Sequence, residues 1–163
     1  MPYKFMFAGL ILAIGCTTAV AAMAKSDKEF LSDAIKTDNS EIRLGDLATK
    51  KGGSDGVRSF AQTLIDDHRR AKDDATALAT DLDVKITGIV TTEAQNEIEK
   101  LQSLSGPEFD KEFVNYIVST HEKDISEFRE KAGEGGRPVP ELAKKMLPTL
   151  QQHLQLAHSL SGH

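Results

Sequence analysis

Tryptophan is absent from this 163-residue sequence, and tyrosine and phenylalanine are few. The single cysteine, Cys16, lies in an apolar N-terminal segment, so the rest of the chain cannot form an internal disulfide. Strand-like alternation of apolar and polar residues never extends beyond a few positions, which argues against a β-sheet. The domain must therefore be stabilised by the packing of helices or by a bound ligand.

The composition and motifs also exclude several kinds of function. The formal net charge is -5 and no run of basic residues is present, which argues against a nucleic-acid partner. We find no Ser-His-Asp order, no Cys-x-x-Cys pair and no glycine-rich phosphate loop. The glycine-rich stretch 133–136 follows no predicted strand, so we interpret it as a linker between helices.

The first 24 residues are typical of a signal peptide. Lys4 precedes an uncharged apolar run from Phe5 to Val20, and Ala22-Met23-Ala24 matches a cleavage signature. The run is short for a stable membrane span, and no later segment is long enough to be one. We therefore predict a signal peptide over 1–24, a domain over 25–163, and a periplasmic location.

An alternative fate for the N-terminus is lipidation. Ala13-Ile14-Gly15-Cys16 partly resembles a lipoprotein cleavage box, although Ala13 stands where leucine or valine is usual. Lipidation of Cys16 would make the protein a membrane-anchored lipoprotein.

The remaining chain has the spacing of amphipathic helices, with apolar residues at steps of three and four. We expect helices over 26–51, 54–83, 92–104, 105–132 and 140–161. Gly52-Gly53 is expected to end the first helix in a left-handed conformation. Pro148 lies inside the last helix and predicts a bend there.

The connections between these helices predict an all-α, ferritin-like four-helix bundle. Short connections make the first and second long helices antiparallel neighbours, and the third and fourth likewise. The long connection over 84–104 contains the short helix and crosses between the two pairs. This crossover makes the second and third long helices parallel.

One polar side chain falls on the apolar stripe of each long helix. These are Glu41, His68, His121 and His153. The helical registers place them at similar depths along the bundle, within reach of a shared ion. Imidazole and carboxylate groups suit zinc, copper or iron, so we predict a site for one such ion formed by these four residues.

The same positions leave other interpretations open. A two-iron oxidase site is not favoured, because no Glu-x-x-His pair is present, and we do not predict an enzyme. Asp67, Asp110 and Asp124 are candidates to hold the imidazoles, either around a metal or in a buried network without one. His158 and His163 lie off the stripe and are expected on the surface.

Short motifs follow one another along the predicted helices. They are Phe60-Ala61 with Asp67-His68, Phe109-Asp110 with Tyr116 and His121, and Leu147-Pro148 with Leu150 and His153. Their order resembles the exported bacterial ferritin-like proteins of the family named domain of unknown function 4142, over essentially the whole domain. The resemblance implies a ferritin-like bundle in the cell envelope and no established reaction, with a weak link to stress.

Two functions are therefore expected. The first is an exported bundle that binds one metal ion and contributes to metal sequestration or envelope stress tolerance. The second is a non-catalytic structural or interaction module of the cell envelope, with a buried His–Asp network. Its partner would be another envelope protein or a second copy of the chain.

Overall fold

Five α-helices make up most of residues 25–161, which are the residues described by the structure, a computed structural model. The helices are α1 (Asp27–Lys51), α2 (Asp55–Asp81), α3 (Thr92–Gln102), α4 (Gly106–Gly133) and α5 (Pro138–Leu160). Every expected helix is present, with its ends within two residues of the prediction. None of the described helices is long and apolar enough to span a membrane. The predicted signal peptide, with Cys16, lies outside the described residues.

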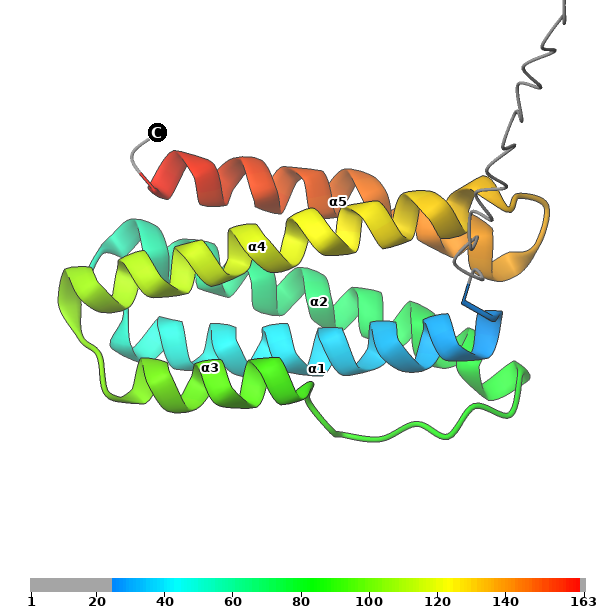
Figure 1. Cartoon of the computed structure of the whole chain (residues 1–163), viewed down its shortest axis with the longest axis horizontal. Coiled ribbons are helices and arrows are strands. Elements are labelled where there is room, and N and C mark those ends of the chain that lie inside the picture. The colour runs from blue at the N-terminus through cyan, green and yellow to red at the C-terminus, as the bar shows by residue number, and fades with distance from the viewer. Residues whose placement is uncertain (1–24, 162–163) are drawn as a thin grey trace, which may run out of the picture.

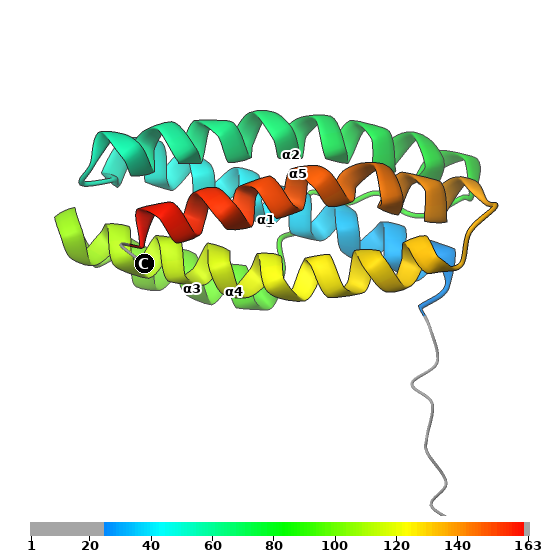
Figure 2. The ribbon, with the colours of Figure 1, turned by 90° about the horizontal axis from the view of Figure 1, so that it is seen from above.

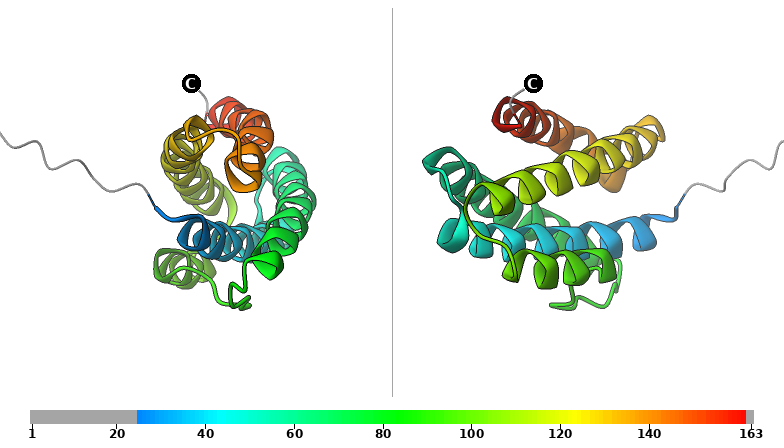
Figure 3. Two further views of the ribbon diagram at one scale, coloured as in Figure 1. Left: turned by 90° about the vertical axis from the view of Figure 1, so that its right-hand side faces the viewer. Right: turned by 60° about the vertical axis from the view of Figure 1, so that its left-hand side comes forward.

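The four long helices form the predicted four-helix bundle (Figure 1). The antiparallel pairs are α1 with α2 and α4 with α5, and α2 and α4 run in the same direction. Seen end-on, the long helices surround a common interior and α3 lies outside it, against α1 and α4 (Figure 3). From above, α5 lies between α2 and α4, with α1 behind it (Figure 2). Helix α5 continues through Pro148 without ending there.

Local interactions fix the two ends of α1. At its start, Ser26 and Glu29 form a capping box: Glu29 Oε2 accepts from the Ser26 amide at 3.0 Å. At its end, the left-handed conformation expected of Gly52 is wrong, because its φ is -52°. Glycine is needed at the next position for space instead. A Cβ on Gly53 would lie 2.7 Å from the backbone of Gly106, so the α1–α2 turn packs directly on the start of α4.

The interior of the bundle has two apolar clusters with a polar layer between them. One cluster includes Leu44, Leu64, Phe109, Phe113 and Ile117, and the other includes Phe30, Leu31, Ile35, Ile125 and Phe128. Along each long helix, a buried polar residue separates the residues that belong to one cluster from those that belong to the other. The apolar ends therefore hold the helices in register, and the layer between them is where the predicted site lies.

Candidate metal centre

The three histidines predicted on α2, α4 and α5 meet in this polar layer. His121 Nε2 lies 3.2 Å from His153 Nδ1, and the His68 ring centroid lies 5.8 and 5.4 Å from those of His121 and His153. One ring nitrogen from each histidine lies within 4.8 Å of one from each of the others. Across the described part of the chain, this is the only group of three histidine, cysteine or acidic side chains that converges this closely.

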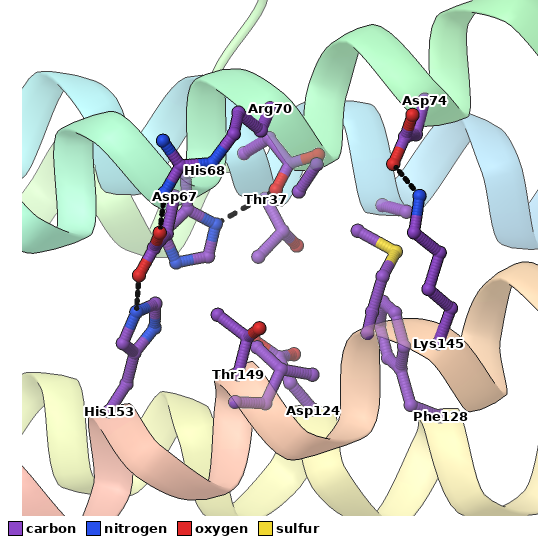
Figure 4. A pocket seen from close by; sticks show the side chains of 15 residues that line it. Thr37, Asp67, His68, Arg70, Asp74, Asp124, Phe128, Lys145, Thr149 and His153 are labelled. Atoms are coloured by element: carbon purple, nitrogen blue, oxygen red, sulfur yellow. Dashed lines mark hydrogen bonds and ion pairs between the residues drawn. The ribbon is translucent and has the colours of Figure 1, made fainter.

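Each imidazole is held from outside the cluster by an oxygen atom. His68 Nδ1 lies 2.8 Å from Asp38 Oδ1, and His153 Nε2 lies 2.8 Å from Asp67 Oδ2. Figure 4 shows the bond between Asp67 on α2 and His153 on α5. His121 Nδ1 lies 3.1 Å from the carbonyl oxygen of Ile117, one turn earlier on α4. These outer contacts fix the orientation of all three rings.

The outer contacts also fix which ring nitrogens carry hydrogen. A carbonyl oxygen can only accept, so His121 Nδ1 must donate to Ile117, and Nε2 of the neutral ring is a lone pair. His153 Nε2 donates to the Asp67 carboxylate in the same way, which leaves Nδ1 as a lone pair. Two lone pairs therefore face each other across 3.2 Å. They repel unless a cation or a proton lies beside them.

The surroundings favour neutral rings at two of the three positions. Burial lowers the pKa of His121 well below its usual value, and the nearby His68 and His153 lower it further. Burial also lowers the pKa of His153, although its bond to Asp67 opposes this. At His68, burial is the largest single influence and opposes the charge, but the hydrogen bond to Asp38 and the negative charges of Asp38, Glu41 and Asp124 together outweigh it, so the pKa rises. A metal ion would therefore compete with a proton mainly at His68.

Comparison with known proteins identifies the family. The model of the domain of unknown function DUF4142 matches residues 15–160. The chain belongs to the DUF4142 family. A comparison of this DUF4142 chain with curated proteins found no match. Its fold is similar to the crystal structure of a DUF305 fragment from Deinococcus radiodurans, with a TM-score of 0.74 and 15% sequence identity, over 85% of this chain and 97% of that one. At that identity the likeness concerns the fold alone.

Glu41, predicted as a fourth ligand, does not join the histidine group of this DUF4142 domain. Its side chain is buried, and its Oε1 accepts from Thr120 Oγ1 at 3.3 Å. Its other oxygen, Oε2, is buried and has no hydrogen-bond partner among residues 25–161. Burial raises the pKa of Glu41 to about 7, which shows how costly an uncompensated charge is at this position.

The three aspartates predicted around the histidines have different positions. Asp67 holds His153, as predicted. Asp124 shares a pocket with His68 but bonds to none of the histidines, and burial raises its pKa to about 6. Asp110 is a correction: its carboxylate accepts from the amides of Gly53 and Ser54 at 2.7 and 2.8 Å. Asp110 therefore satisfies free amides at the start of α2. A cluster of apolar side chains lies between it and the histidines.

Asp38, the partner of His68, was not among the residues predicted from the sequence. It lies seven residues after Leu31 and four after Ala34, so the stripe of α1 contained the signal. Asp38 is 4% exposed, and its Oδ2 has no partner within the described part of the chain. The buried carboxylate adds negative charge beside the histidines and so favours a bound cation.

A pocket of about 200 Å³ connects the histidine cluster with the surface between α2 and α5. His68 and His153 line its inner end, with Asp67 (Figure 4), and Asp38 also lines the pocket. At its outer part, Lys145 on α5 pairs with Asp74 on α2 at 2.8 Å. An ion or a small ligand could therefore reach the cluster without separation of the helices.

Proposed function

We propose that this DUF4142 protein binds one transition-metal ion through His68, His121 and His153. The observation that carries the proposal is the set of outer hydrogen bonds, which leaves a lone pair of each neutral ring for the interior. Outer oxygen partners of this kind are usual for histidines that bind metals. Nitrogen ligands suit zinc, copper and iron.

The distances support this proposal. Two nitrogens on a tetrahedral zinc ion lie about 3.3 Å apart, since each Zn–N bond is close to 2.0 Å. The 3.2 Å separation of His121 Nε2 and His153 Nδ1 agrees with that value. Since the ligand nitrogens of the whole group lie within 4.8 Å of one another, His68 would approach the other two by about 1.5 Å at most. The pocket between α2 and α5 would leave a fourth coordination position open to a small ligand.

The biological role we propose is metal sequestration or stress tolerance in the cell envelope, rather than turnover of a substrate. Three protein ligands with an open position also occur at catalytic metals. However, the group that converges contains histidines alone, without the carboxylate ligands typical of two-iron oxidases. Export and a periplasmic location are part of this proposal and come from the sequence of residues 1–24.

A second candidate function is a structural or interaction module in which the histidines and aspartates form a closed polar network. It is favoured by the hydrogen bonds of 2.8 Å that already join His68 to Asp38 and His153 to Asp67. In that case a proton shared between His121 and His153 would replace the metal ion.

Metal content separates the two candidates. The full chain should be produced without an affinity tag in its native compartment, and its zinc, copper and iron measured by elemental mass spectrometry. We expect about one equivalent of one of these metals, and uptake of Co²⁺ by the stripped protein with visible absorption bands of nitrogen ligation. Substitution His121→Ala should weaken Co²⁺ binding more than about 100-fold.

His158→Ala is the matched control, because His158 is an exposed histidine further along the same helix as His153. It should leave Co²⁺ binding unchanged. Equal Co²⁺ affinity of His121→Ala and His158→Ala, or no uptake of any of these metals by the parent protein, would support the closed network instead.

A further inference from the structure

A second pocket opens on the other side of the bundle, and its lining differs from that of the first, with which it shares Thr37 and Asp124. It has a volume of about 230 Å³ and lies between α1, α4 and the start of α3. Every lining side chain except Lys123 ends in oxygen, as a hydroxyl or a carboxylate. No histidine lines it. Apart from Lys123, whose ammonium group cannot bind a cation, the pocket therefore presents only oxygen ligands.

Two carboxylate groups at this pocket lack the partners that buried charges need. Glu41 is 1% exposed, and one of its oxygens makes only the 3.3 Å bond with Thr120. Its Oε2 and the Oδ2 of Asp124 are buried and accept no hydrogen bond from any residue in 25–161. Leaving such groups without partners destabilises a folded protein, so a structure that retains both usually compensates them.

We propose that this pocket is a second cation site, in which Glu41 and Asp124 bind a hard divalent ion of the magnesium, manganese or calcium class. Carboxylates, hydroxyls and water are the ligands that these ions prefer. The hydroxyl of Thr120, which lines the same pocket, would add a third oxygen. None of these ligands is a histidine, although Asp124 also lines the first pocket, and the site does not depend on the proposed function.

The charges around the pocket agree with a divalent ion. Glu41, Glu93 and Asp124 contribute three negative charges when ionised, and Lys123 contributes one positive charge. The balance is two negative charges, which a divalent cation would neutralise. The oxygen lining also favours such an ion over copper or zinc, because these two metals prefer nitrogen and sulfur ligands.

Terbium luminescence gives a direct test, because Tb³⁺ occupies oxygen sites and is sensitised by a nearby aromatic ring. The chain has no tryptophan and two tyrosines, Tyr3 and Tyr116, and Tyr116 lines the pocket. In the full chain with Tyr3→Phe, any tyrosine-sensitised emission must therefore come from an ion near Tyr116. We expect saturable emission at one equivalent of Tb³⁺, displaced by Mn²⁺ or Ca²⁺.

Glu41→Gln and Asp124→Asn should each weaken Tb³⁺ binding at least tenfold, with folding checked by circular dichroism. If one variant fails to fold, the Tb³⁺ affinity of the other variant tests the proposal. The absence of saturable emission from the parent, or emission unchanged in the folded variants, would overturn the proposal. Either result would mean that Glu41 and Asp124 do not form a cation site.

His153→Ala distinguishes this site from the histidine centre. His153 lines the first pocket and not the second. The variant should lose Co²⁺ binding and keep Tb³⁺ emission. Loss of Tb³⁺ emission in His153→Ala would overturn a separate site. Co²⁺ binding without Tb³⁺ emission in the parent would reject the second site alone.

Discussion

Two buried polar clusters in this bundle differ in whether the residues of the cluster satisfy all of its hydrogen-bonding groups. Lys131, near the end of α4, is 3% exposed. Its ammonium group donates to the carbonyl oxygen of Lys25, to Asp27 at 3.4 Å and to Glu134 at 2.7 Å. An ammonium group has three donors, and here three oxygens accept them. This cluster needs no further ligand.

The histidine centre is buried to the same extent and remains incomplete. The outer nitrogens of its rings are satisfied, but Nε2 of His68 has no partner among the described residues. The lone pairs of His121 and His153 face each other. Carboxylate oxygens of Asp38, Glu41 and Asp124 nearby are also buried without partners. A polar group that is buried without a partner destabilises the folded state. We therefore interpret the Lys131 cluster as architectural and the histidine centre as a binding site.

The largest effect that we expect on stability concerns Glu41. Its pKa in the folded protein is about 7, above the ordinary value of 4.5, so the folded state resists ionisation. Stability from this group is fully present below pH 4.5 and is lost as the pH rises through 7. Glu41→Gln should therefore leave stability in EDTA unchanged at pH 4.5 and raise it by about 3 kcal/mol at pH 8.

Urea unfolding of both proteins at the two pH values measures this difference. The parent protein with saturating Mn²⁺ at pH 8 is the control, because a bound cation should remove most of the advantage of the variant. An advantage that is equal at pH 4.5 and pH 8 would show that burial of the Glu41 charge is not its cause.

A somewhat smaller effect is expected at Lys131. Lys131→Met removes the ammonium group from Asp27 and Glu134, which are 20% and 24% exposed and keep Arg137 as a partner. We expect a loss of about 2 kcal/mol, below the range for fully buried pairs. Urea unfolding checks this value, and Co²⁺ binding should stay unchanged if the cluster is purely architectural.

Lys145→Met is the matched control for this substitution. Lys145 also pairs with a carboxylate, Asp74, at 2.8 Å, but its side chain is 69% exposed. Its loss should change stability by less than about 1 kcal/mol. Similar values for the two variants would mean that burial of Lys131 does not determine its contribution.

Helical spacing and the lengths of the connections together predicted the fold and the meeting of the three histidines. Steps of three, four and seven residues assign each histidine to an interior stripe, and short connections fix which helices are neighbours. The 3.2 Å contact between His121 and His153 agrees with the register counted from the α4–α5 turn. Asp110 could have been excluded in the same way. It lies eleven residues before His121, or about 16 Å along the helix.

Spacing could not predict the direction in which a side chain turns. Glu41 lies at the expected depth, but its carboxylate is directed to Thr120 and the oxygen-lined pocket, not to the histidine group. Asp38 takes the position beside His68 instead. Both residues lie on the interior face of α1, three apart, and rotamers set by the neighbouring helices decide between them. The sequence places both carboxylates on this face, but it does not show which of them turns towards the histidines.

The smallest effect that we expect concerns the outer support of the histidine centre. Asp67 is 19% exposed and accepts from His153 Nε2 at 2.8 Å. Asp67→Asn can keep a hydrogen bond to the ring but loses the negative charge that makes the opposite nitrogen a better ligand. Co²⁺ affinity, measured by competition with a chelator, should fall about tenfold.

Asp74→Asn provides the comparison for this substitution, since Asp74 lies on the same helix and lines the same pocket without bonding to a histidine. Its effect on Co²⁺ affinity should be less than about twofold, because an exposed charge near the pocket mouth is screened by solvent. Equal losses in the two variants would mean that Asp67 acts only through the general negative charge of the pocket. A loss confined to Asp67→Asn would assign it to the support of His153, and so to a centre completed by a metal ion.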